Sequence, residues 1–416
     1  MSKSLDDLYE DYRPGWSLPG PFYADPEVFE AEVEQIFRPM WQFAGHACEI
    51  PEPGDYFTFD ASGDSIIVIR TDDGDLKALF NTCRHRGSAI CREARGHAKR
   101  LVCPYHNWTY DKDGALIAAR AMPEEVDKSM LGLHRANLRM VAGLIFVCTV
   151  GTTPDFGPVA AAFGALLDPH DLGGAKIAHS MTYQLPANWK LIVENHRECY
   201  HCPSAHKEYA RIHYDTRLSS DTWKPEISAR TEACRVKWSA MGLDTGNVNP
   251  TSSFTGAWWR ANRTAFPSGH VTESPDGQPV APLMGQFTDT DMGTARAGTY
   301  PNFWLHATSD HATTMRLIPM GPDSTLMRAD WLVRDDAVEG VDYDVDKVIA
   351  FTDRVNREDR ELILGQADGV RSSRYGPGPL VMDDEQRVKH FLDWYMGKMT
   401  SPASLTDRPS AIARSS

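Results

Sequence analysis

The sequence lacks several features that mark common classes of protein. Its 43 lysine and arginine residues are outnumbered by 57 aspartate and glutamate residues, so the formal net charge is −14. We therefore expect no nucleic-acid partner, because phosphate binding needs a basic surface. The longest apolar stretch, Val141–Val150, is well short of the roughly 20 residues that cross a bilayer. The acidic start, MSKSLDDLYEDYRPGW, does not resemble a secretion signal. A cytoplasmic protein without a membrane segment is expected.

A dinucleotide-binding fingerprint is also missing. We find no Gly-x-Gly-x-x-Gly after a strand-like run that would hold NAD(P)H or flavin. Any redox chemistry would therefore draw electrons from a separate protein. Cysteine is scarce as well, with eight residues, and in a reducing compartment these indicate metal ligands or small core residues before disulfides.

The length of 416 residues predicts two domains. The runs SIIVIR (65–70) and LKALFN (76–81), joined by TDDGD, are typical of a β-hairpin. Apolar residues at helical spacing predict a long helix over 341–369. The expected divisions are an N-terminal helical segment that packs on the second domain (1–39), a β-rich first domain (40–152), a second domain (153–400) and a disordered tail (401–416).

The first candidate metal site combines two mixed pairs of ligands. Cys83 and His85 form a Cys-x-His pair, and after seventeen intervening residues Cys103 and His106 form a Cys-x-x-His pair. Two thiolates on one iron and two imidazoles on the other form the ligand set of a Rieske [2Fe–2S] cluster. A structural zinc ion is the alternative, although zinc ligands usually come as like pairs, Cys with Cys and His with His.

Other cysteine and histidine residues lie close to these sites. We expect Cys91 and His97, which lie between the two pairs, to be structural because the four ligand positions are already filled. Cys199 and Cys202 form a C-x-x-C motif without a surrounding thioredoxin-like βαβ pattern. We expect them to be small packed residues.

The second candidate site lies in NWKLIVENHRECYHCPSAHKEY, which starts at Asn188. His201 and His206 are five residues apart, so they converge only if the helix bends or ends between them, and Pro203 lies at that point. Two imidazoles and one carboxylate with open coordination positions form the facial triad of non-haem Fe(II) oxygenases. Two structural histidines are the alternative.

These two motifs, CRHRG with CPYHNWTYDKDG and NWK…EN…YH…H, resemble the α subunits of Rieske non-haem iron oxygenases. The resemblance implies an α+β fold, with an all-β Rieske domain followed by a catalytic domain whose large antiparallel sheet is flanked by helices in a helix-grip arrangement. It also implies a mononuclear Fe(II), O2 as co-substrate, NAD(P)H acting only through a separate flavin or iron–sulfur reductase, and a homotrimer in which the cluster of one subunit supplies the iron of the next.

The resemblance also assigns further residues. It places the third iron ligand in a late helix, which favours Asp359, with Glu358 as the alternative. It places an electron-transfer bridge between subunits at Glu198, where aspartate is more usual. The string ENHRECYHC is similar to the branch that acts on quaternary ammonium compounds, such as glycine betaine, stachydrine and carnitine oxygenases.

Such a substrate is held well by aromatic faces through cation–π attraction. The catalytic half offers several aromatic side chains, although most aromatic residues are ordinary core residues. The candidates for substrate binding are Trp258, Trp259, Tyr300, Phe303 and Trp304, with Trp238 and Phe254 also in this half.

The expected function is hydroxylation and N-demethylation of a betaine-like substrate. An aromatic-ring dioxygenase would use the same two metal sites and is the first alternative. A Rieske electron-transfer protein, which needs only the first site, is the second.

Overall fold

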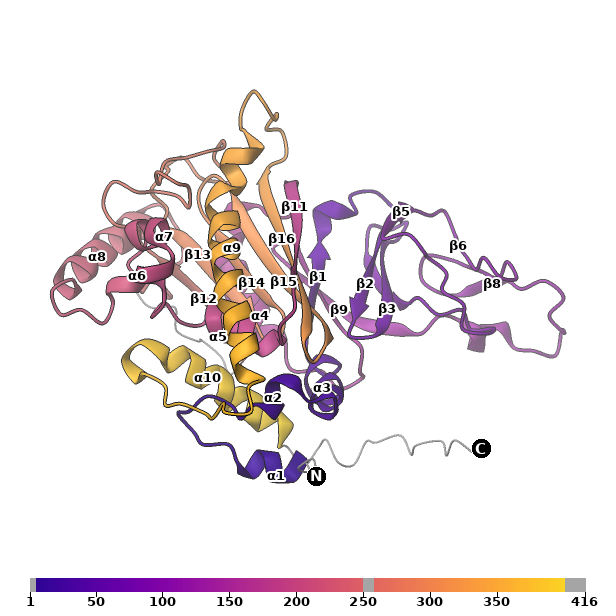
Figure 1. Cartoon of the computed structure of the whole chain (residues 1–416). Coiled ribbons are helices and arrows are strands. Elements are labelled where there is room, and N and C mark those ends of the chain that lie inside the picture. The colour runs from indigo at the N-terminus through magenta and orange to yellow at the C-terminus, as the bar shows by residue number, and fades with distance from the viewer. Residues whose placement is uncertain (1–4, 250–257, 401–416) are drawn as a thin grey trace.

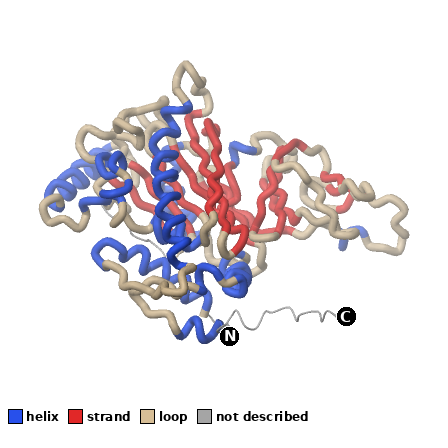
Figure 2. Tube along the Cα trace, viewed as in Figure 1, coloured by secondary structure: helices blue, strands red, loops and turns tan. Residues whose placement is uncertain are grey.

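The computed structural model describes residues 5–249 and 258–400, and these form two parts built on separate antiparallel sheets (Figures 1 and 2). The amino-terminal part consists mainly of strands, and the larger second part combines one sheet with helices. This arrangement confirms the expected α+β class. The tail expected at 401–416 lies outside the described residues.

The amino-terminal part contains a seven-stranded sheet, in the order β1-β10-β9-β4-β3-β2-β5, and a three-stranded sheet, β6-β7-β8. The predicted hairpin is present as β3 and β4, which pair antiparallel on either side of the turn. Its strands are β1 (Gln42–His46), β2 (Asp55–Ala61), β3 (Asp64–Arg70), β4 (Leu76–Phe80), β5 (Arg95–His97), β6 (Leu101–Val102), β7 (Thr109–Tyr110), β8 (Leu116–Ala118), β9 (Arg135–Val141) and β10 (Leu144–Cys148).

The second part is organised by a six-stranded sheet in the order β11-β16-β15-β14-β13-β12, with every neighbouring pair antiparallel. Its long central strands bring residues that are distant in the sequence to one surface. The strands are β11 (Ala175–Leu185), β12 (Trp259–Thr264), β13 (Thr294–Thr299), β14 (Phe303–Ala307), β15 (Ala312–Gly321) and β16 (Ser324–Arg334).

The predicted long helix is α9 (Val345–Val370), which lies across one face of this sheet in Figure 1. It begins where the Asp344 side chain accepts a hydrogen bond from the Asp346 N–H, a standard N-cap. The other α-helices are α1 (Leu5–Glu10), α2 (Pro21–Ala24), α3 (Pro26–Glu32), α4 (Gly157–Leu167), α5 (Trp189–His196), α6 (Cys202–Ala205), α7 (Lys207–Ile212), α8 (Lys224–Ala240) and α10 (Met382–Met399). Short turns of other helix types are η1 (Val33–Phe37), η2 (Ala47–Glu49), η3 (Lys128–Leu131), η4 (Asp168–His170) and η5 (Asp215–Arg217).

Two hydrophobic cores cover the two faces of the six-stranded sheet. On one face, Trp331 and Leu317 pack with side chains of α5, α9 and α10 and with Phe22 and Phe37 of the amino-terminal helices. On the other face, α4 and strands β1 and β10 of the seven-stranded sheet form the second core. The first core therefore fixes α5 and α9, the two helices that frame the site described below.

Among the described residues, no helix combines the length and the apolar character that a bilayer crossing requires.

Candidate metal centres

The second candidate site is formed where α5 ends. This helix begins at the N-cap Asn188, whose side chain accepts from the Lys190 N–H, and it ends at His196. The chain then turns through the four-residue helix α6, so that His201 lies immediately before α6 and His206 immediately after it. Pro203 lies in the first turn of α6. The two histidines are thus separated by a helix break, as their spacing requires.

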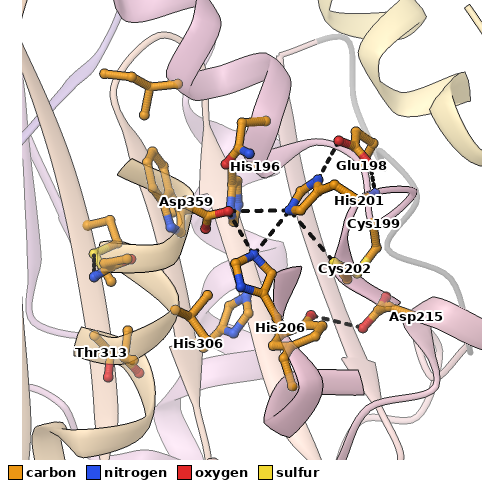
Figure 3. A pocket seen from close by; sticks show the side chains of 18 of the residues that line it. His196, Glu198, Cys199, His201, Cys202, His206, Asp215, His306, Thr313 and Asp359 are labelled. Carbon is orange, nitrogen blue, oxygen red and sulfur yellow. Dashed lines mark hydrogen bonds and ion pairs between the residues drawn. A yellow bond between two sulfur atoms is a disulfide. The ribbon is translucent and has the colours of Figure 1, made fainter. Parts of the chain in front are cut away.

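His201, His206 and Asp359 point toward one another in Figure 3. The two Nε2 atoms are 3.2 Å apart. Oδ1 of Asp359 lies 2.8 Å from Nε2 of His206 and 3.3 Å from Nε2 of His201. Asp359 comes from α9, more than 150 residues later in the chain.

These separations suit three ligands on one octahedral metal ion. Ligand atoms at about 2.1 Å from a common ion, at right angles to one another, lie about 3 Å apart. The donor set of two imidazoles and one carboxylate is the set that non-haem Fe(II) sites use. The three side chains therefore fit an iron with its remaining positions open.

Each imidazole directs its other nitrogen at a carboxylate. Nδ1 of His201 lies 2.5 Å from Oε1 of Glu198, and Nδ1 of His206 lies 2.8 Å from Oε2 of Glu358. Such outer carboxylates orient ligand histidines and make them more basic. Glu358, the alternative third ligand, thus contacts the nitrogen of His206 that faces away from the three-atom group.

The carboxylates close to His201 raise its pKa. Burial acts to lower this pKa, but hydrogen bonds with Asp359 and Glu198 outweigh burial and raise it to about 9. The opposite effect appears at Asp359, where burial acts to raise the pKa and the two histidines lower it below its ordinary value. A group of carboxylates that favours a positive charge at its centre also favours a bound cation.

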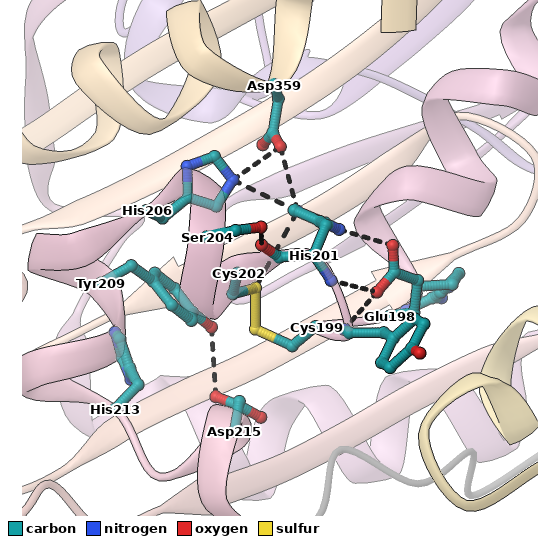
Figure 4. The surroundings of a disulfide bond; sticks show 12 residues. Glu198, Cys199, His201, Cys202, Ser204, His206, Tyr209, His213, Asp215 and Asp359 are labelled. Atoms are coloured by element: carbon teal, nitrogen blue, oxygen red, sulfur yellow. Dashed lines mark hydrogen bonds and ion pairs between the residues drawn. A yellow bond between two sulfur atoms is a disulfide. The ribbon is translucent and has the colours of Figure 1, made fainter. Parts of the chain in front are cut away.

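Glu198 is held within the turn that carries His201. Its carboxylate accepts hydrogen bonds from the backbone N–H groups of Tyr200 and His201. Figure 4 shows that Cys199 and Cys202 form a disulfide across the same turn, with their Cα atoms 4.9 Å apart. The expectation that these cysteines are merely small packed residues is therefore wrong. The signal that could have indicated the disulfide is the C-x-x-C motif itself.

The first candidate site consists of two loops with equivalent backbone geometry. In each loop the cysteine carbonyl accepts from the N–H four residues later, Gly87 to Cys83 and Asn107 to Cys103. Gly87 and Asn107 both have positive φ, which these residue types tolerate best. The first loop follows β4 and the second joins β6 to β7.

In these loops the two histidines lie next to each other, and so do the two cysteines. The rings of His85 and His106 have centroids 4.6 Å apart, and Cys83 hydrogen-bonds to Cys103. Burial acts to raise the pKa of Cys103, but the Tyr105 N–H and Cys83 outweigh it and lower that pKa. The cysteines are buried, whereas His85 is exposed. A [2Fe–2S] cluster with cysteines on one iron and histidines on the other fits this separation.

Cys91 and His97 make contacts of their own within the amino-terminal domain. Cys91 is buried in the core of this domain, and its carbonyl accepts from the Asn81 side chain. Nδ1 of His97 lies 2.9 Å from Oδ1 of Asp55. Both contacts agree with the structural roles expected for them.

A cavity opens beside the three converging ligands, and Trp304 is the only one of the five candidate aromatic residues that lines it. Phe303 precedes Trp304 in β14 and therefore faces the opposite side of the sheet, where it is buried in the second core. Trp259 packs against the second core, Trp258 against both cores, and Tyr300 lies in the first core. Trp238 belongs to α8 and is buried in a separate hydrophobic cluster, and Phe254 lies outside the described residues.

The charged groups in the cavity wall were not predicted, because they lie on strands and loops far apart in the chain. Arg296 makes two contacts with Asp215, at 2.7 and 2.9 Å. Glu273 lies 3.0 Å from Nδ1 of His306. Burial acts to raise the pKa of Glu273, but His306 and His213 hold it well below its ordinary value. Two acids in the wall are therefore charged and paired.

Comparisons with known proteins agree on the class of protein. Residues 172–401 match the catalytic domain of ring-hydroxylating α subunits, and residues 40–137 match the Rieske [2Fe–2S] domain. The glycine betaine monooxygenase oxygenase subunit of Chromohalobacter salexigens is 37% identical over 95% of this chain and 88% of its own. The chloroplastic choline monooxygenase of Spinacia oleracea is 27% identical over 90% of this chain and 76% of its own.

A solved structure extends the likeness to the whole fold. The quaternary ammonium Rieske monooxygenase CntA, in complex with its substrate gamma-butyrobetaine, superposes with a TM-score of 0.70. The superposition covers 96% of this chain and 100% of the other, at 23% sequence identity. At that identity the likeness shows a shared fold.

Proposed function

Because the chain belongs to the Rieske ring-hydroxylating oxygenase α subunits, we propose that it hydroxylates an N-methyl group of a betaine-like quaternary ammonium compound. The observation that carries this proposal is the convergence of His201, His206 and Asp359 beside a cavity that Trp304 lines. An aromatic face there suits a methylated ammonium. The compounds for which the similar chains are named, glycine betaine and choline, are both quaternary ammonium compounds.

We assign the ligands of the two metal centres accordingly. The Rieske cluster is bound by Cys83, His85, Cys103 and His106. The mononuclear iron is bound by His201, His206 and Asp359, and Glu358 orients His206 from outside. A ferrous iron with only three protein ligands keeps positions open, which the activation of O2 requires.

The reaction requires electrons from another protein. One C–H bond of the N-methyl group breaks and a C–OH bond forms, while the second oxygen atom of O2 leaves as water with two protons and two electrons. The N-hydroxymethyl product then loses formaldehyde and a proton and leaves the tertiary amine. We propose a separate reductase as the electron source, since the similar bacterial chain is named an oxygenase subunit. We also propose a cytoplasmic location, where a reductase would find NADH.

We propose that the electrons reach the iron from a neighbouring subunit, in a homotrimer. The loops of Cys83 and Cys103 lie in the domain at the right of Figure 1, whereas the turn of α6 and α7 lies at the left. Glu198, on the partly exposed turn beside His201, is the bridge in this arrangement. Its hydrogen bond to an iron ligand gives electrons a short covalent and hydrogen-bonded path.

The test is turnover by the iron-replete protein together with an NADH-dependent Rieske reductase. We expect O2 uptake and formaldehyde release in equal amounts with a quaternary ammonium compound, and no NADH oxidation without the reductase. Release of a cis-diol from an arene, without formaldehyde from any quaternary ammonium compound, would instead identify an aromatic-ring dioxygenase. A protein that holds the cluster but no mononuclear iron would be an electron carrier only.

A further inference from the structure

One row of cross-strand neighbours on the six-stranded sheet faces the cavity. Arg260 in β12 is opposite Gly298 in β13, Gly298 is opposite Trp304 in β14, and Trp304 is opposite Met315 in β15. Directly opposite residues in a sheet project from the same face. Arg260, Trp304 and Met315 accordingly all line the cavity.

The glycine in this row leaves space for the arginine. A Cβ atom at Gly298 would lie 3.0 Å from the carbonyl oxygen of Phe303 and 3.5 Å from Nε of Arg260. The Arg260 side chain therefore lies over the backbone of β13 and extends toward α5. There its Nη2 donates to Nε2 of His196 at 2.9 Å.

His196 positions this guanidinium beside the aromatic wall. Its ring stacks on Trp304 with centroids 4.3 Å apart and planes 20° apart. Burial and the nearby positive charge of Arg260 hold the pKa of His196 well below its ordinary value. His196 is therefore a neutral acceptor, and its hydrogen bond leaves the positive charge of Arg260 in place.

The charges of the cavity are arranged unevenly. The acids on the metal side are Glu198 and Asp359, next to the histidines that would hold the iron. On the sheet side, burial and the cations Arg197, Arg296 and Arg387 lower the pKa of Arg260, and the wall acid Glu273 is paired with His306. The charge of Arg296 is balanced by Asp215. Arg260, which is 3% exposed, lines the cavity in the same row of cross-strand neighbours as Trp304.

We propose that Arg260, held over Gly298 and against His196, binds a carboxylate of the substrate, so that the site selects zwitterionic betaines over quaternary ammonium compounds without a carboxylate. A guanidinium fork matches a carboxylate in shape and charge. This inference rests on the proposed function and narrows it. Among the similar chains, one is named for glycine betaine, which has a carboxylate, and another for choline, which has none.

Three probes of almost equal shape separate the two charges. Glycine betaine carries the ammonium and the carboxylate, choline carries the ammonium and a hydroxyl, and 3,3-dimethylbutanoate carries the carboxylate with an uncharged carbon in place of nitrogen. Dissociation constants are measured by calorimetry with the iron-replete, resting protein. Binding is thus measured without turnover.

Arg260→Gln is expected to weaken binding of glycine betaine and of 3,3-dimethylbutanoate by about 30-fold or more, the loss typical of a buried charged partner. Binding of choline should change less than about twofold, since choline has no carboxylate to lose. Arg260→Lys keeps the charge without the fork and should give an intermediate loss. If Arg260→Gln does not fold, the lysine variant still decides between the outcomes.

Arg334→Gln serves as the control, because Arg334 of β16 pairs with Asp336 at the surface, away from the residues that line the cavity. It should leave the ratio of the glycine betaine and choline constants unchanged. An equal loss for all three probes in the Arg260 variants, or no loss for glycine betaine, overturns the inference. Failure of the proposed function would appear separately, as the absence of formaldehyde from every quaternary ammonium compound offered to the wild type with its reductase.

Discussion

At the scale of single residues, the two candidate ligand histidines differ in the carboxylate that contacts their Nδ1 atom. His201 is oriented by Glu198 from its own turn, whereas His206 is oriented by Glu358 from α9. Asp359, the adjacent residue of α9, faces the opposite nitrogen of His206. Neighbouring acids of one helix thus have different tasks, which substitutions can separate.

Asp359→Ala should remove the mononuclear iron and leave the cluster. Iron analysis should then give only the two irons of a [2Fe–2S] centre per subunit, with an unchanged Rieske EPR signal on reduction. Glu358→Gln is the matched variant. This variant should keep most of the mononuclear iron. Its affinity for iron or its activity should fall by about 10- to 100-fold, because Glu358 only orients a ligand. Full iron content in Asp359→Ala would contradict the ligand assignment.

Glu198→Gln tests the electron path. We expect turnover with the reductase to fall by about 10- to 100-fold or more, while iron content and the EPR signal stay as in the wild type. Glu208→Gln, which removes a surface contact with Arg354, provides the control and should turn over normally. Full coupled turnover of Glu198→Gln would exclude the bridging role.

At the scale of elements, α5 is tied to the amino-terminal helices by a buried polar network. Lys190 pairs with Glu32, and the Tyr23 hydroxyl donates to Glu194 at 3.0 Å. Burial raises the pKa of Glu194 to about 7, although Tyr23 and Lys190 oppose the change. Folding therefore strengthens proton binding at Glu194. The resulting stability is complete below the pKa of the unfolded carboxyl and is lost as pH rises through about 7.

This titration predicts that thermal stability falls from about pH 4.5 to pH 8, by about 3 kcal/mol at this one group. Glu194→Gln cannot ionise, so its unfolding temperature should lose this part of the pH dependence and exceed that of the wild type on the alkaline side. Scanning calorimetry across this pH range gives the comparison. Glu361→Gln, an exposed acid of α9, should keep the wild-type profile. Parallel profiles for wild type and Glu194→Gln would contradict the assignment.

The turn between α5 and α7 provides a chemical prediction. The tryptic peptide from Glu198 to Lys207 contains both Cys199 and Cys202. Alkylation of the unfolded, unreduced protein should leave this peptide unmodified and lighter by two hydrogen atoms, whereas the six other cysteines react once the cluster is removed. Cys202→Ser should make Cys199 reactive. Alkylation of both cysteines in the wild-type peptide would contradict the disulfide.

The sequence predicts those elements whose pattern is local. The hairpin of β3 and β4, the long helix α9 and the two mixed metal-ligand pairs all depend on spacing within one segment. The cavity wall could not be predicted in the same way. Phe303 and Trp304 are adjacent aromatic residues, yet strand alternation places them on opposite faces, and the sequence alone does not say which one faces the cavity. Arg260 in β12 contacts His196 at the end of α5, although the two residues are 64 positions apart in the chain.

At the scale of the whole molecule, the two proposed metal centres lie in separate domains with their own sheets. The cluster loops extend from the far end of the amino-terminal domain in Figure 1, away from the turn that carries His201 and His206. Electron transfer within one chain would have to cross both domains. In the proposed homotrimer each cluster instead meets the iron of the adjacent subunit, as a head-to-tail cyclic assembly allows.

Mixed oligomers distinguish the two routes. Cys103→Ser should lack the cluster and Asp359→Ala should lack the iron, so each variant alone should be inactive with the reductase. When the two variants are co-expressed in equal amounts, random assembly should restore activity to about a quarter of the wild-type level, because each productive contact needs one particular variant on either side. Electron transfer within a subunit would leave every mixture inactive, since no single chain would then hold both centres. Size-exclusion chromatography with light scattering on the same mixtures shows whether three chains assemble.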